Sequence, residues 1–336
     1  MFFFKKSWIF FLSLLVLAAN STAYFKKNDS GEEVFSFLGS FSSARSAALE
    51  NANAAMPSSN PGDVLQNPAL ILLSPNQKNA VSFAWQTGEF ADNQGYLAYA
   101  RQIGKMVALV SYGWIRYGEI DGYDNMGNPT DKSYKPQSSV AGLSLSLPLP
   151  HFQFGSTVKF ASDLLSDEGN DQTAMAFAFD WGVLWQSSSR KFGFGLAARN
   201  FGKMIRAYVD GGDTDYGLEE SFDLSAFYIP GLLPRLSLHA KTTFPRYAEP
   251  ALSLGGEYAL GSSLFVRLGF SRTWLDISRD VKEIFSSSDR PDETNDARLF
   301  SAGLGYTGSR FSLDYAFSYL AQDLGTEHRI GLGLKF

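Results

Sequence analysis

The sequence predicts an all-β protein, namely a transmembrane β-barrel of about 14 antiparallel strands with an N-terminal, partly helical hatch. Three observations favour this fold class. Apolar residues alternate with small or polar residues along most of the chain, and the connections between these segments alternate between short and long. No apolar run after residue 23 is long enough for a transmembrane helix, but a barrel strand needs only every second residue to be apolar.

The composition narrows the possible functions. Aromatic residues make up 15% of the 336 residues and charged residues only 19%, which suits strands and membrane interfaces. The net charge of −5 leaves no basic excess, so we expect no nucleic-acid partner. The absence of cysteine excludes thiol nucleophiles and thiolate metal sites, and an all-histidine metal site would need His151, His239 and His328 to converge. We expect no catalytic residues, cofactor or metal, and therefore no enzyme.

Residues 1–23 predict a secretory signal peptide that is cleaved between Ala23 and Tyr24. Lys5 and Lys6 supply its positive region, and an apolar stretch and small residues before the cleavage site complete the pattern. The apolar stretch is shorter than the roughly 20 residues that span a bilayer as a helix. We expect export through a bacterial inner membrane.

Residues 24–75 do not alternate and form the predicted hatch. The stretch 41–55 is rich in serine and alanine, and the apolar content of 64–73 argues against a disordered tail. A segment of this length can fold into the barrel lumen as a plug.

Residues 76–336 form the predicted barrel. Alternation is clearest at 311–319, where Phe311, Leu313 and Tyr315 are separated by small or polar residues. The expected strands are 78–88, 95–103, 105–117, 137–148, 151–164, 173–186, 191–206, 219–229, 233–246, 250–260, 262–276, 297–307, 309–320 and 327–336.

The longest predicted connections are 118–136, 165–172, 207–218 and 277–296. Bacterial outer-membrane barrels have short periplasmic turns and long extracellular loops, so both ends of the barrel are predicted to be periplasmic and its surroundings to be outer-membrane lipid. The terminal Phe336 resembles the insertion signal of such proteins. Aromatic residues expected to face lipid are Trp85, Tyr112, Trp114, Trp181, Trp185 and Trp274.

Few residues indicate a catalytic or metal-binding site. Ser237 and His239 lie on the predicted lumen-facing side of one strand, where a polar stripe is the first interpretation and a hydrolase site a much weaker one. Three acidic loop groups lack the twelve-residue spacing of a calcium loop, and we expect solvated or docking loops there. These groups are Asp121, Asp124 and Asn125; Asp210, Asp213 and Asp215; and Asp289, Asp292, Glu293 and Asp296.

Three short motifs carry a family resemblance. The run 43–49, followed some twenty residues later by Asn67, Pro68 and Ala69, resembles the start of the PorV/PorQ family, part of the FadL-like superfamily of long-chain fatty-acid transporters. The stretch 192–202 ends where relatives carry a turn of Arg-Asn-hydrophobic-Gly type. The stretch 117–128 resembles the PorQ branch through Asp121, Gly122, Tyr123, Asp124, Gly127 and Asn128.

The resemblance implies a 14-stranded barrel with an N-terminal hatch. It further implies a role in type IX secretion, in which the extracellular loops contact secretion-system or surface-attachment proteins. The superfamily also contains channels that take up long-chain fatty acids or other hydrophobic compounds, which implies a hydrophobic ligand in the lumen as the alternative. Likeness of fold alone does not choose between these functions.

Overall fold

The computed structural model describes residues 33–73, 76–88, 91–124, 126–166, 172–286, 298–320 and 325–336. The predicted signal peptide and the cleavage site between Ala23 and Tyr24 lie outside these residues. No described helix is long and apolar enough to cross a membrane.

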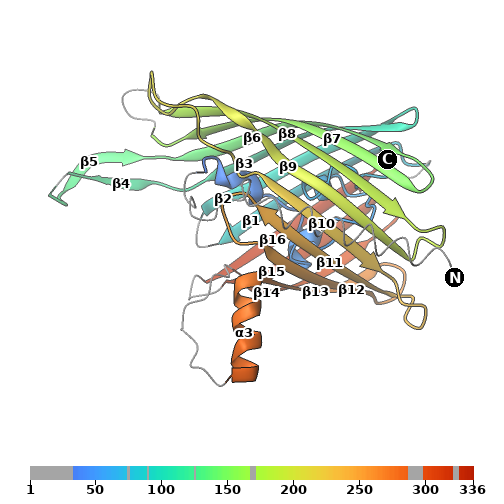
Figure 1. Cartoon of the computed structure of the whole chain (residues 1–336). Coiled ribbons are helices and arrows are strands. Elements are labelled where there is room, and N and C mark those ends of the chain that lie inside the picture. The colour runs from blue at the N-terminus through green and yellow to red at the C-terminus, as the bar shows by residue number, and fades with distance from the viewer. Residues whose placement is uncertain are drawn as a thin grey trace.

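Within the described residues, 14 antiparallel strands form a closed barrel, which confirms the predicted fold class and strand number (Figure 1). β1 closes the barrel against β16, with Ala80 opposite Lys335. The strands are β1 (Asn79–Gly88), β2 (Ala91–Ile103), β3 (Met106–Arg116), β6 (Gln137–Pro148), β7 (Phe152–Leu164), β8 (Thr173–Gln186), β9 (Phe192–Arg206), β10 (Ser221–Tyr228), β11 (Leu236–Pro245), β12 (Ala251–Ala259), β13 (Leu264–Thr273), β14 (Arg298–Thr307), β15 (Phe311–Leu320) and β16 (Thr326–Lys335).

The alternating sequence produces a barrel with an apolar outer face. In β15, Phe311, Leu313 and Tyr315 are 54%, 46% and 39% exposed, while Asp314 and Ser318 are buried on the inner face. Such a large apolar surface is unfavourable in water and favourable against lipid tails. The outer side of the wall is therefore a lipid-facing surface.

The ends of the barrel differ. Because β1 and β16 are antiparallel neighbours, β1 begins and β16 ends at the same end of the barrel. Phe336 follows β16 and exchanges backbone hydrogen bonds with Asn79. The longest connections, 117–136, 165–172, 207–220 and 274–297, all leave the opposite end.

Two elements at this far end differ from the sequence expectation. The predicted loop 118–136 contains a two-stranded hairpin of β4 (Ile120–Tyr123) and β5 (Pro129–Tyr134), which extends beyond the barrel (Figure 1). The strand predicted at 262–276 ends at Thr273, and helix α3 (Trp274–Ser286) follows it. The strand prediction was wrong there because the apolar spacing changes from two residues to three or four.

The wall between β8 and β9 is irregular. The register shifts between Phe179 and Trp181, and Asn200 in β9 adopts a positive φ of 61°. The backbone nitrogen of Asn200 donates to Oδ1 of Asp180 at 2.7 Å. The turn expected at 199–202 is therefore a bulge inside β9. The extra residue, Asn200, has a backbone N–H that does not pair with the neighbouring strand, and the Asp180 side chain accepts its hydrogen bond instead.

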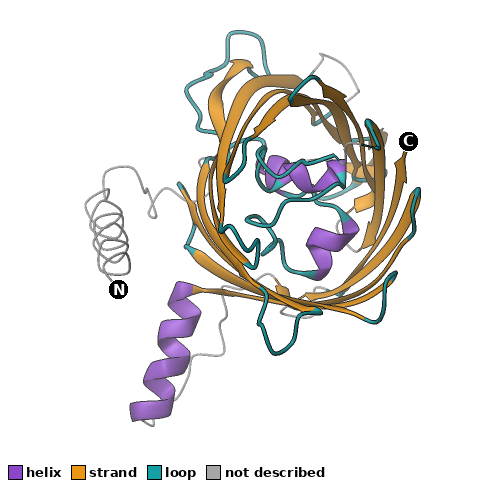
Figure 2. Ribbon diagram, turned by 90° about the vertical axis from the view of Figure 1, so that its right-hand side faces the viewer, coloured by secondary structure: helices purple, strands orange, loops and turns teal. Residues whose placement is uncertain are grey.

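Residues 33–73, here called the lumen segment, lie inside the barrel (Figure 2). They include the short helices η2 (Ser36–Gly39), α2 (Ala44–Ala48) and η3 (Pro61–Leu65). The side chain of Ser43 accepts a hydrogen bond from the Ser46 nitrogen and caps α2, and Asn60 caps η3 in the same way.

Candidate functional site

The candidate site is the contact between the lumen segment and the barrel wall. Helix α2 packs against β13, β14, β15 and β16, whereas η3 packs against β1 and β2. These six strands are consecutive in the closed wall, and Asn67 of the same segment reaches β9 on the other side of the lumen. Any movement of solute through the lumen therefore has to pass the segment.

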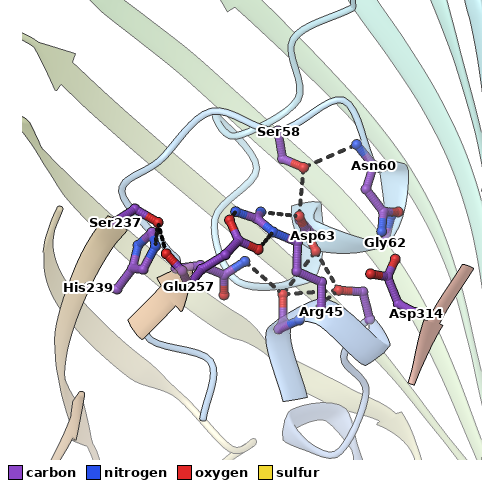
Figure 3. Close-up of polar contacts among 12 residues, drawn as sticks. Arg45, Ser58, Asn60, Gly62, Asp63, Ser237, His239, Glu257 and Asp314 are labelled. Atoms are coloured by element: carbon purple, nitrogen blue, oxygen red, sulfur yellow. Dashed lines mark hydrogen bonds and ion pairs between the residues drawn. The ribbon is translucent and has the colours of Figure 1, made fainter. Parts of the chain in front are cut away.

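Arg45 of α2 connects the lumen segment to the wall (Figure 3). Its Nε and one terminal nitrogen each lie 2.9 Å from a carboxylate oxygen of Glu257 in β12, and its other terminal nitrogen lies 3.1 Å from Asp63 in η3. Burial favours the neutral form of Arg45, but the charges of Glu257 and Asp63 raise its pKa above the usual value. Arg45 therefore stays charged and holds α2, η3 and β12 together.

The ion pairs continue into the wall. Arg267 in β13 lies 2.6 Å from Glu257 and also 2.6 Å from Asp314 in β15. Acidic and basic groups thus alternate from Asp63 to Asp314, and each of these side chains is at most 13% exposed. A buried ion pair of this kind is strongly destabilised when one partner is removed.

Asp63 also organises the lumen segment itself. Besides Arg45 it accepts hydrogen bonds from the hydroxyl groups of Ser43, Ser46 and Ser58, the last two at 2.9 and 2.6 Å. Ser43 and Ser46 belong to the start of α2, and Ser58 lies in the connection that leads to η3. A single buried carboxylate therefore fixes the relative positions of α2, η3 and the turn between them.

A small cavity lies on the other side of the lumen segment. Its segment side consists of apolar residues such as Leu38, Phe41 and Val64, whereas its wall side is mixed. It has about 20 Å³ of space for the centres of water molecules, which is room for about one water. The remaining lining residues are Leu65, Tyr96, Ser111, Val140, Gly142, Ser144, Thr157, Lys159 and Asp180.

The polar groups of the cavity are mostly paired with one another. Lys159 lies 2.7 Å from Asp180 and donates to the side-chain oxygen Oδ1 of Asn200 at 2.7 Å. The Tyr96 hydroxyl is buried and has no hydrogen-bond partner within the described part of the chain. The cavity therefore combines an apolar side, an internally neutralised ion pair and one free hydroxyl.

The connection between β9 and β10 also holds the lumen segment. Val34 donates its backbone N–H to the Gly217 oxygen at 2.9 Å, and Gly39 donates its backbone N–H to a carboxylate oxygen of Glu219 at 2.6 Å. Burial raises the pKa of Glu219 to about 7, although Arg199, Lys159 and the Gly39 hydrogen bond act in the opposite direction and Glu33 adds to the increase. The charge of Glu219, which accepts a hydrogen bond from the lumen segment, therefore changes near neutral pH.

No protein-family model and no curated protein sequence matches the chain significantly. Solved structures match it at the level of fold. The toluene transporter TbuX of Ralstonia pickettii aligns with a TM-score of 0.59 and 14% identity, over 90% of this chain and all of that one. The monoaromatic hydrocarbon channel CymD aligns with a TM-score of 0.57 and 9% identity, over 90% and 98%.

A deletion mutant of the monoaromatic hydrocarbon channel TodX gives a TM-score of 0.58 at 12% identity, over 87% of this chain and 97% of that one. The chain shares the fold of these channels. This finding supports the FadL-like part of the sequence resemblance at the level of fold, whereas the PorV/PorQ part remains a prediction.

The motif Asn67, Pro68 and Ala69 lies in the lumen against β8 and β9. The Asn67 amide donates to the carbonyl oxygens of Ala54 and Leu196, both at 3.2 Å. A Cβ atom at Gly182 would lie 1.9 Å from the Asn67 carbonyl oxygen, so only glycine allows this approach. The motif thus contacts the wall directly.

The PorQ-like residues lie in and around the β4–β5 hairpin, far from the lumen cavity. The side chain of Asp124 accepts hydrogen bonds from the Met126 and Asn128 nitrogens at 2.8 and 2.9 Å, which closes the turn. The remaining members are Asp121, Gly122, Tyr123 and Gly127.

Ser237 and His239 lie beside Glu257, since Ser237 is opposite Glu257 in the register of β11 and β12 (Figure 3). Ser237 Oγ and His239 Nε2 lie 3.0 Å apart, buried on the inner face of β11 beside Lys241, which donates to Gln66 at 3.2 Å. Among the described residues no group of three or more acidic or histidine side chains could hold a metal ion. The acidic group at 289–296 lies outside the described residues.

The ion pairs around Arg45 were not predicted from the sequence. Arg45 lies inside the quoted 43–49 motif, and Glu257, Arg267 and Asp314 occupy inward positions of their strands. The available signal for buried ion pairs was that these charged residues stand among small residues on the inner faces of their strands. Spacing along the chain does not indicate which charged residue pairs with which.

Arg45→Met should release the lumen segment. The substitution leaves Asp63 and Glu257 buried without their shared cation, at a cost of about 3–5 kcal/mol. We expect backbone amides of residues 44–65 to lose protection in hydrogen–deuterium exchange, while heat-modifiable migration of the barrel is unchanged. Arg235→Met, at an exposed turn position, is the control. Equal protection in both variants would contradict this account.

Raising the pH should destabilise the packing of the lumen segment on Glu219, because ionisation places a charge on a buried carboxyl, and this cost exceeds what the Gly39 hydrogen bond recovers. The folded-state pKa of about 7 exceeds the usual value of 4.5, so the stabilisation is complete below pH 4.5 and decreases as the pH rises through 7. We expect faster protease cleavage within residues 33–39 at pH 8 than at pH 5. In Glu219→Gln this difference should disappear, and an unchanged pH dependence in that variant would refute the assignment.

Proposed function

We propose that the protein is a passive channel for small hydrophobic compounds in a bacterial outer membrane, with the lumen segment controlling passage. The observation that carries the proposal is the lumen cavity, where apolar side chains of the segment face the wall. An apolar compound needs such a surface along its route, whereas a water-filled porin offers a polar lumen. The hydrocarbon channels of similar fold support the proposal by analogy.

The charge of the cavity favours a neutral compound over a fatty acid. Lys159 is already paired with Asp180 at 2.7 Å and bound to Asn200, so its charge is balanced within the protein. A carboxylate entering the cavity would have to compete with Asp180 for this cation. A neutral aromatic or aliphatic compound needs only apolar contact and, where it carries an acceptor, the free Tyr96 hydroxyl.

Passage requires movement of the lumen segment. The cavity has room for about one water, whereas a cavity that binds benzene measures about 150 Å³. The side of the segment nearest the cavity is apolar and the opposite side is held by Arg45 and Asp63. We propose that the apolar side moves away from the wall while the ion pairs keep the segment attached.

Val140→Trp should block uptake. Val140 is buried and lines the cavity, and a tryptophan there occupies the space through which the compound has to pass. We expect a barrier to passage higher by about 1.4 kcal/mol, which is a tenfold decrease in rate. The measurement is entry of radiolabelled toluene into cells that produce each variant. Leu143→Trp on the same strand is the control, because Leu143 is 55% exposed and faces outward.

Two results would count against the channel. One is toluene entry no faster with the wild-type barrel than without it. The other is equal entry through the Val140 and Leu143 variants when both barrels are folded and present in equal amounts.

A second candidate function is attachment of exported proteins in type IX secretion, to which the PorV/PorQ resemblance points. The observation that favours it is the β4–β5 hairpin, which extends from the barrel at the end with the longest connections (Figure 1). Its turn is held by Asp124, whose pKa is lowered chiefly by the side-chain hydrogen bond from Asn128. Ile120, Tyr123 and Met126 are 50%, 64% and 89% exposed and offer apolar contacts to a partner.

Deletion of residues 118–136 separates the two functions. Under the attachment function, the deletion should abolish co-purification of secreted proteins with the barrel and release them from the cell surface. Toluene entry should be unchanged, since the hairpin does not line the cavity. Normal surface retention of exported proteins in the deletion strain would exclude the attachment function.

A further inference from the structure

Helix α3 leaves the barrel sideways. Figure 1 places it at the end of β13, and the view along the barrel in Figure 2 has it extending outward from the wall. The β4–β5 hairpin, in contrast, extends away along the direction of the barrel (Figure 1). With 13 residues α3 is about 20 Å long, and it runs parallel to the plane of a membrane around the barrel.

The helix has one apolar and one charged face. Trp274, Ile277 and Val281 follow each other at spacings of three and four residues and share one face. Trp274 and Val281 are 44% and 47% exposed and Ile277 between them is half-buried, so a large part of this face is open. Arg279 and Glu283 lie on the opposite face.

The direction of α3 is fixed by contacts with β13. The hydroxyl of Thr273 accepts a hydrogen bond from the Asp276 nitrogen at 3.2 Å, which caps the first turn. Arg272, the last outward residue of β13, lies 2.5 Å from Asp280 one turn further along the helix. The strand and the helix are thus joined by both a cap and an ion pair.

Aromatic residues place the base of α3 at the membrane boundary. Phe270 pairs with Phe300 on β14, and the ring of Phe300 stacks on that of Tyr319 at 5.9 Å. Such aromatic belts mark the lipid–water interface. Trp274 follows Phe270 by four residues, which on a tilted strand is about 10 Å further out, within the headgroup layer.

We propose that α3 is an interfacial helix that lies on the outer-leaflet lipid beside the barrel, with Trp274, Ile277 and Val281 in the lipid. Its apolar face continues the lipid-facing surface of β13, and its charged face meets water and headgroups. The helix extends the contact of the barrel with the membrane and fixes its depth. The proposal rests on the predicted orientation of the barrel in an outer membrane, with the longest connections outside, and it is independent of transport and attachment.

The absence of native cysteine makes a direct test possible. Val281→Cys and Glu283→Cys place a single thiol on opposite faces of α3, two residues apart. Each is labelled with an environment-sensitive fluorophore, and the barrel is reconstituted in vesicles with or without lipids carrying a quencher in the upper acyl chain. Leu268→Cys on the lipid-facing wall and Met126→Cys at the hairpin provide the lipid and water references. Heat-modifiable migration confirms that each variant is folded.

The label at position 281 should be quenched by the lipid roughly two- to threefold more than the label at 283, because an interfacial apolar face lies about 5–10 Å inside the boundary. Aqueous iodide should give the reverse order. Equal lipid quenching at both positions, or a label at 281 that behaves like the one at 126, overturns the proposal. A label at 281 protected from both quenchers indicates a protein-covered face, such as a second copy, and overturns it as well.

Discussion

The arrangement inside the barrel depends on the ion pairs of Arg45. Its planar guanidinium bridges two buried carboxylates, Asp63 of the lumen segment and Glu257 of the wall. A lysine at this position would have a single ammonium group, whereas two nitrogens of the Arg45 guanidinium donate to the two carboxylate oxygens of Glu257. The contact joins residues 212 positions apart in the chain, so it determines which part of the wall the lumen segment faces.

The lumen segment has two sides that differ in chemistry. Toward β12 it is held by the ion pair of Arg45 with Glu257, which Arg267 and Asp314 continue within the wall. Toward β2, β3 and β6 it presents Leu38, Phe41 and Val64. Apolar contacts are non-directional and can be exchanged for a ligand, whereas a broken ion pair leaves buried charge. This asymmetry gives the segment a fixed side and a side that can open, and it is the basis of the proposed route.

The sequence contains local patterns for helix α3 and for the bulge in β9, but neither element was predicted from them. The spacing of Trp274, Ile277 and Val281 is helical, but it follows directly on the period-two alternation of β13 and was interpreted as its end. The Arg199–Asn200 pair was expected in a turn and lies in a bulge, because Asp180 on the neighbouring strand accepts from the Asn200 nitrogen. In both cases the missing information was the identity of a spatial neighbour.

What the sequence by itself determined is the alternation of faces, and with it the class of fold and the number of strands. Lipid and lumen lie on opposite sides of every strand, so the polarity of each residue indicates which side its side chain faces. Only the tertiary structure decided that Arg45 meets Glu257, that Asn67 packs on Gly182, that the cavity lined by Val140 has room for about one water, and that α3 runs outward from the wall. These features depend on the closure and stagger of the barrel, which bring together residues that no spacing along the chain relates.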